Sequence, residues 1–186
     1  LRSSRALWAI ALAAGFTNAC FNWGMTSGEV LRVVLLFYLM PVWAILLARW
    51  LLGEPITGGA ILRALLAIAG AATVLWQPGT LIPWPASLGD WLGVAGGMSF
   101  GLLNVLLRRH GETPAAARAL AMSVGSALVP ACVAAVLVAT NLLSSPPAPR
   151  ADWLIGAALL AAVLLSANAL LQYGAPRLPT RVTAIV

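Results

Sequence analysis

The sequence predicts an all-α protein built as a polytopic bundle of transmembrane helices. Six apolar runs of about bilayer length fill most of the 186 residues, and hydrophobic residues make up 61% of the chain while charged residues make up 9%. Soluble domains carry about 25% charged residues, whereas about 20 apolar residues in a helix cross a hydrocarbon core about 30 Å thick. A soluble core could not bury this much apolar surface.

Each apolar run is expected to form one membrane-crossing helix. Proline clusters in the connections 77–87 and 144–150, where it ends helices. A further run begins near Pro179 and breaks off at Val186, so we expect this chain to be part of a longer protein. The six complete runs are Arg5–Trp23, Val30–Leu52, Thr57–Trp76, Leu88–Leu107, Thr113–Leu142 and Asp152–Gln172.

The arginines predict which helix ends face the cytoplasm. All eleven basic residues are Arg, and most lie in short connections, which is a topology pattern rather than the basic patch of a nucleic-acid-binding protein. Arg32 and Arg150 fall on one side, so we expect the connections 77–87 and 144–150 to lie outside and 108–118 to be cytoplasmic. The cytoplasmic set is Arg2, Arg5, Arg49, Arg63, Arg108, Arg109, Arg118, Arg177 and Arg181.

Two segments 150 residues apart resemble each other. Residues 18–24 read Asn-Ala-Cys-Phe-Asn-Trp-Gly, and residues 168–174 read Asn-Ala-Leu-Leu-Gln-Tyr-Gly. The first run is expected to go from inside to outside and the sixth in the opposite direction. Related segments of opposite direction indicate an inverted-topology repeat, which is common in secondary transporters. A repeat of five helices predicts about ten helices in the complete protein.

The most specific pattern lies in residues 41–57. A proline within a helical run is followed by Leu-Leu-Gly-Glu-Pro-Ile-Thr at 51–57 and then by a run of small residues that ends near 70–74. This pattern resembles the EamA domain of the drug/metabolite transporter superfamily, and residues 89–112 are similar to the opening helix of a second copy. The resemblance implies a ten-helix inverted-repeat carrier. In that scheme 1–76 is the end of the first repeat, 77–87 an outer linker, and 88–186 the second repeat, truncated in its fourth helix.

The resemblance also implies a function. We expect a secondary transporter in a bacterial inner membrane that exports small metabolites such as amino acids or drugs by alternating access. A non-transporting membrane scaffold or receptor, and a lipid-linked flippase, stay open as alternatives. The expected partners are a small-molecule substrate and membrane lipid, without nucleic acid, cofactor or metal. An enzyme is not expected, because the sequence has no His-Glu-x-x-His and no Gly-x-Ser-x-Gly.

Polar side chains inside the apolar runs are the candidate substrate-binding residues. Such groups are costly in hydrocarbon and usually face the bundle interior, and amides four residues apart share one helix face. The alternative interpretation is that the amides hold helices together, at about 0.6 kcal/mol each. The residues expected to bind substrate are Asn18, Asn22, Tyr38, Asn104, Asn168, Gln172 and Tyr173.

Three further residues are candidates for gating. Pro41 frees a carbonyl four residues earlier and can kink its helix. Glu29 and Arg32 lie three residues apart at the outer mouth and are expected to pair.

Glu54 is expected to cap the next helix, whose N-terminus carries a partial positive charge. Small residues at a spacing of four favour close helix packing, which is the role expected for Gly93, Gly97 and Gly101.

Overall fold

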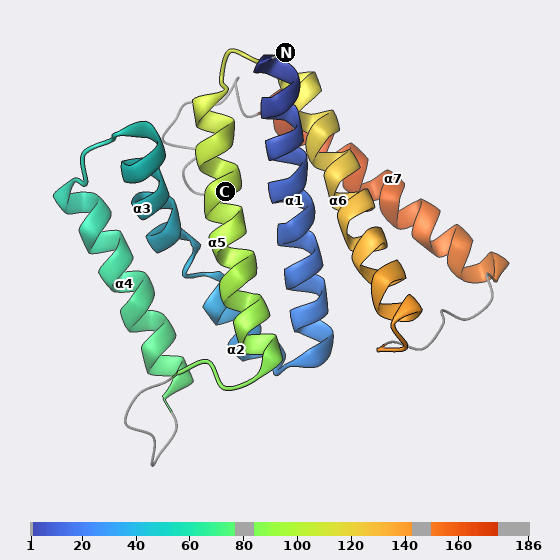
Figure 1. Ribbon diagram of the computed structural model, residues 1–186, viewed down its shortest axis with the longest axis horizontal. Helices are drawn as coiled ribbons and strands as arrows, with labels where there is room; N and C mark the ends of the chain where they lie inside the picture. The colour runs from blue at the N-terminus through green and yellow to red at the C-terminus, as the bar shows by residue number, and fades with distance from the viewer. Residues whose placement is uncertain (1, 77–83, 143–149, 175–186) are drawn as a thin grey trace. The chain divides into compact units, whose positions relative to one another are not determined.

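The computed structural model describes residues 2–76, 84–142 and 150–174, and all regular secondary structure in these ranges is α-helical (Figure 1). The chain divides into two compact units, Leu1–Leu143 and Ser144–Val186, and each is described by itself. The helices are α1 (Arg2–Ser27), α2 (Val30–Phe37), α3 (Met40–Leu52), α4 (Gly58–Leu75), α5 (Leu88–Arg109), α6 (Ala115–Ala139) and α7 (Ala151–Gly174).

The helices match the six predicted apolar runs, and α2 and α3 share the second run. Among the described residues, three stretches are long and apolar enough to cross a membrane, namely Val30–Leu52, Leu88–Arg109 and Ala115–Ala139. Helices α4 and α7 contribute shorter apolar segments. Large apolar side chains such as Trp50 and Leu66 are 81% and 64% exposed, as expected of a surface that meets lipid. The prediction of an all-α membrane bundle is confirmed.

The second run is broken at Tyr38 and Leu39, as the position of Pro41 predicts. Proline has no N–H to donate to the carbonyl of Phe37, four residues earlier. The chain tightens at this point, since the Leu39 N–H donates to the Leu36 carbonyl at 3.3 Å before α3 begins. The helix is therefore interrupted just before Pro41, and whether this break acts in gating stays a prediction.

Three glycines of α5 pack against the backbone of this broken helix. A Cβ added at Gly93 would lie 2.7 Å from the Val33 carbonyl oxygen, and one at Gly97 would lie 2.5 Å from the Phe37 carbonyl oxygen. At Gly101 the nearest atom would be a backbone nitrogen of α3 at 3.0 Å. The distances at Gly93 and Gly97 are too short for a side chain and the one at Gly101 is tight, so the predicted packing role of the three glycines is confirmed.

Helix α1 packs on α5 along one side and on α6 along another. Its contact with α5 buries Ile10, Ala13 and Leu103, and the Ser99 hydroxyl of α5 donates to the Ala13 carbonyl at 3.0 Å. Its contact with α6 is close because Gly15 meets Gly125, where an added Cβ would overlap backbone of the facing helix. The sequence had not marked this second glycine contact.

The arginines of the first unit gather at one end of the bundle. Figure 1 shows α1, α2–α3, α4, α5 and α6 alternating in direction, so that the N-termini of α1, α4 and α6 lie with the C-termini of α3 and α5. We call this the arginine-rich end, and Arg32 lies at the opposite end. The arginines at the arginine-rich end are Arg5, Arg49, Arg63, Arg108, Arg109 and Arg118. The assignment of this end to the cytoplasm stays a prediction.

The second unit contains α7, whose first turn holds Asp152 in an ion pair with Arg150 at 3.1 Å. The inverted repeat relates α1 to α7, which belong to different units, so it stays a prediction.

Candidate functional site

Asn18 joins α1 to α6. Its Nδ2 donates to the Ser126 hydroxyl at 2.8 Å and to the Ala14 carbonyl of its own helix at 3.2 Å. The side chain is half-buried. Both amide hydrogens are therefore engaged within the bundle, which is the helix-bonding role that the sequence left open as an alternative.

Asn22, one turn further along α1, is exposed and lines a cavity of about 490 Å³. Its Nδ2 donates to the Asn18 carbonyl at 2.9 Å, which leaves the amide oxygen available to a ligand. The cavity lies between α1 and α6 and is mostly apolar, and Asn22, Thr26 and Ser27 are among its polar side chains. Its other lining residues are Ala19, Trp23, Thr26, Ser27, Pro130, Val133, Ala134 and Leu137.

The predicted shared cavity is assembled only in part. Tyr38 is 57% exposed at the break between α2 and α3, and it is not among the residues lining the cavity of Asn22. The side chains of Asn168, Gln172 and Tyr173 lie outside the part of the chain whose side chains the structure describes. A common binding role for these residues stays a prediction.

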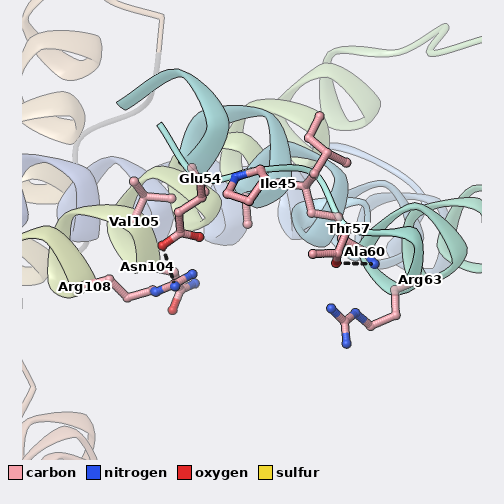
Figure 2. Close-up of a pocket in the computed structure, with 12 residues that line it drawn as sticks. Ile45, Glu54, Thr57, Ala60, Arg63, Asn104, Val105 and Arg108 are labelled. Carbon is pink, nitrogen blue, oxygen red and sulfur yellow. Dashed lines mark hydrogen bonds and ion pairs between the residues drawn. The ribbon is translucent and has the colours of Figure 1, made fainter. Parts of the chain in front are cut away.

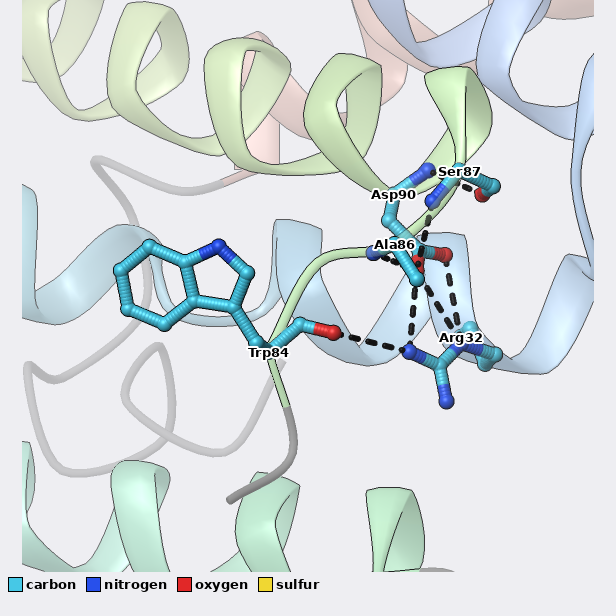
Figure 3. A network of polar contacts seen from close by, with 5 residues as sticks. All are labelled: Arg32, Trp84, Ala86, Ser87 and Asp90. Carbon is cyan, nitrogen blue, oxygen red and sulfur yellow. Dashed lines mark hydrogen bonds and ion pairs between the residues drawn. The ribbon is translucent and has the colours of Figure 1, made fainter. Parts of the chain in front are cut away.

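Arg32 is held by Asp90 at the end opposite the arginine-rich end (Figure 3). The Asp90 side chain is 1% exposed, and its Oδ2 lies 2.9 Å from Nη2 and 3.2 Å from Nε of Arg32. The same carboxylate accepts the backbone N–H of Ala86 at 3.0 Å, while its own N–H donates to the Ser87 hydroxyl. A capping box thus fixes Asp90 at the start of α5.

This arrangement corrects the expected partner of Arg32. The neighbouring Glu29 is exposed, and the ion pair of the guanidinium is made with Asp90 of α5 instead. A carboxylate already fixed by backbone donors loses little freedom on binding the fork of an arginine, which presents two parallel N–H groups. The pair therefore connects two helices rather than stabilising one. The gating roles of Glu29 and Arg32 stay predictions.

A second cavity, of about 330 Å³, opens at the arginine-rich end (Figure 2). Glu54 pairs there with Arg108 of α5 at 2.6 Å, so the expectation that it caps α4 is wrong. Thr57 is the cap, since its hydroxyl oxygen accepts the Ala60 N–H at 3.3 Å. The lining residues are Ala44, Ile45, Ala48, Glu54, Pro55, Ile56, Thr57, Ala60, Arg63, Asn104, Val105 and Arg108.

Asn104 was a cavity candidate and lines this second cavity. Its Nδ2 donates to the Phe100 carbonyl at 2.9 Å, so its amide oxygen remains free to accept. Within the described ranges, no group of three or more His, Cys, Asp or Glu side chains is placed to hold a metal ion.

Comparison with known proteins identifies the N-terminal part of the chain. Residues 2–76 match the model of the EamA-like transporter family. No curated protein and no solved structure matches the chain. The match agrees with the resemblance seen in residues 41–57, and over residues 2–76 the chain is similar to membrane transporters of this family.

The EamA match spans α1 to α4 and therefore contains Asn18, Asn22, Arg32 and Tyr38. Sequence reasoning missed Asp90 as the partner of Arg32, although Ser87 three residues before it is the pattern of a capping box. It also missed Ser126 as the partner of Asn18. A serine within an apolar helix gives no comparable indication of which helix it faces.

Proposed function

We propose that this protein is a secondary transporter that exports small metabolites, such as amino acids or drugs, across a bacterial inner membrane by alternating access. The observation that carries the proposal is the cavity of about 490 Å³ that Asn22 lines between α1 and α6. Small-molecule sites are typically mostly apolar concavities of about 300–1,000 Å³ with a few polar groups that orient the ligand. Asn22, Thr26 and Ser27 would supply those groups.

The chemistry of an uncharged amide suits a carrier of varied solutes. The free oxygen of Asn22 accepts a hydrogen bond from a solute that gives up its water, without the desolvation cost of a fixed charge. Asn18 holds the adjacent turn against α6 through Ser126 at 2.8 Å. We propose that it positions Asn22, and that Gln172 supplies the equivalent amide from the related helix.

Alternating access requires contacts that open at one end of the cavity at a time. We propose that the Arg32–Asp90 pair is the latch between α2 and α5 at one end, and that the break preceding Pro41 is the hinge. The support is the position of that break, which lies between the latch and the arginine-rich end. A hinge there would let α3 move while α2 stays attached to α5.

Efflux from loaded proteoliposomes tests the transport role. Proteoliposomes that carry the protein are loaded with a mixture of radiolabelled amino acids, and the rate of release is compared with that from protein-free liposomes. We expect Asn22→Ala and Gln172→Ala to reduce efflux while leaving the elution profile in detergent unchanged.

Thr73→Val is the matched control for these variants. Thr73 is an exposed residue of α4 whose hydroxyl donates within its own helix at 2.7 Å, so its loss should leave transport unchanged. Normal efflux by both amide variants would assign the amides to packing. Absence of efflux by the unchanged protein over a broad set of solutes would favour a non-transporting role.

A further inference from the structure

We propose that the cavity at the arginine-rich end binds a phosphate ester, with an anionic lipid headgroup as the source that fits its surroundings. This site is separate from the cavity of Asn22, and the proposal depends on membrane insertion but not on transport. It rests on two guanidinium groups, the start of α4 and an apolar rim, all within the cavity of about 330 Å³.

The two arginines approach the cavity from different helices. Figure 2 shows Arg63 of α4 and Arg108 of α5 extending toward the same open side. Arg108 has one Nη bound to Glu54 at 2.6 Å, and a guanidinium has five N–H donors. Among the described residues, Arg63 makes no hydrogen bond or ion pair, although it lines the cavity. One carboxylate and two guanidinium groups leave a net positive charge that suits an anion.

The start of α4 lies at the same cavity, which Thr57 and Ala60 line. Thr57 caps this 18-residue helix and is followed by Gly58 and Gly59. Nothing lies within 4 Å of the position that a Cβ would take at either glycine, while the N–H groups of Ala60 and Ile61 are already bound to Thr57. Helix N-termini attract anions through the helix dipole. Two guanidinium groups and the positive end of one helix dipole thus lie at one cavity.

The rim of the cavity favours a lipid as the carrier of the phosphate. Ile56 lines the cavity and is 43% exposed, and Leu62 of α4, which does not line the cavity, is 58% exposed. The arginine-rich end marks the predicted cytoplasmic interface, where anionic headgroups lie and basic pockets between helices bind them. A phosphodiester in the cavity would place its acyl chains along these apolar side chains. A soluble phosphate ester would use the same donors without the rim.

Native mass spectrometry of the full chain in neutral detergent tests the site. Equal amounts of phosphatidylglycerol and phosphatidylcholine are added, and the ratio of the two retained lipids is measured. One arginine near the surface is worth about 1 kcal/mol toward anionic lipid, which is about a fivefold change in affinity. We expect Arg63→Gln to lower the ratio about fivefold and Glu54→Gln to raise it, because removing the carboxylate releases Arg108.

Arg109→Gln is the matched control, since Arg109 is an exposed neighbour of Arg108 that does not line the cavity. We expect it to leave the ratio unchanged. Calorimetric titration with glycerol 3-phosphate forms a second arm, and binding that Arg63→Gln abolishes there would assign the site to soluble phosphate esters. Equal effects of Arg63→Gln and Arg109→Gln, or no preference for phosphatidylglycerol together with no heat from glycerol 3-phosphate, would overturn the proposal.

Discussion

Removing the carboxylate of Asp90 should be among the most destabilising single changes in the first unit. The perturbation is Asp90→Ala, which leaves the partly buried guanidinium of Arg32 without its partner and also removes the acceptor of the Ala86 N–H at 3.0 Å. Breaking a buried ion pair from one side costs about 3–5 kcal/mol. Since Arg32 is 17% exposed and can turn partly toward water, we expect a loss of about 3 kcal/mol.

The assay is reversible unfolding in mixed micelles, followed by tryptophan fluorescence. Asp152→Ala is the matched control, because Asp152 forms an arginine pair at 3.1 Å with 64% of its side chain exposed. Exposed pairs contribute about 0–1 kcal/mol, so this variant should unfold nearly as the unchanged protein does.

A double-mutant cycle with Arg32→Gln isolates the pair itself. We expect a coupling free energy above about 1 kcal/mol between the two positions, since contacting residues couple by about 0.5–3 kcal/mol. A loss below about 1 kcal/mol for Asp90→Ala, or a loss as large for Asp152→Ala, would refute the inference that burial makes this pair strong.

Two further predictions concern packing and topology. Gly97→Ala should destabilise the protein by about 1–3 kcal/mol, because its Cβ would lie 2.5 Å from the Phe37 carbonyl oxygen. Gly70→Ala is the control and should be neutral or slightly stabilising, since nothing lies within 4 Å of its Cβ position. Unfolding in micelles compares the two variants, and equal effects would contradict the close packing at Gly97. On whole cells, a cysteine placed at Ala148 should react with an impermeant thiol reagent and one at Gly111 should not, and the reverse labelling would invert the assigned sides.

The sequence was sufficient to predict the membrane environment, the helices and the break between α2 and α3. Apolar length alone separates membrane helices from soluble ones, and Pro41 marks its break through the missing N–H. The stripe of Gly93, Gly97 and Gly101 predicted a close helix contact, which α5 makes with α2 and α3. These features are local, so each can be derived from one segment without knowing its neighbours.

Pairings between helices could not be derived in the same way. Arg32 had a candidate partner three residues away in Glu29, yet its guanidinium binds Asp90, 58 residues along the chain. The choice depends on which helix α2 contacts and on the capping box that fixes the carboxylate. Glu54 was misassigned for the same reason, since the prediction considered the following helix and not α5, which supplies Arg108. Residue spacing can show that a helix face packs closely, but not which helix it meets or which partner a long side chain reaches.

Helix α5 is joined to the α2–α3 segment in three different ways along its length, and the order of these contacts indicates where motion costs least. At one end the carboxylate of Asp90 is 1% exposed, and in the middle the glycines admit no side chain between the backbones. At the arginine-rich end the contact is the Glu54–Arg108 pair, with 38% and 63% of the two side chains exposed, and water replaces such a pair at a cost of about 0–1 kcal/mol. The chain between Leu52 and α4 turns through Gly53, whose φ of 70° few other residues adopt. When the helices rock, we therefore expect α5 and α3 to separate first at the arginine-rich end. The contact between α5 and α2 at Asp90, at the opposite end, should stay closed.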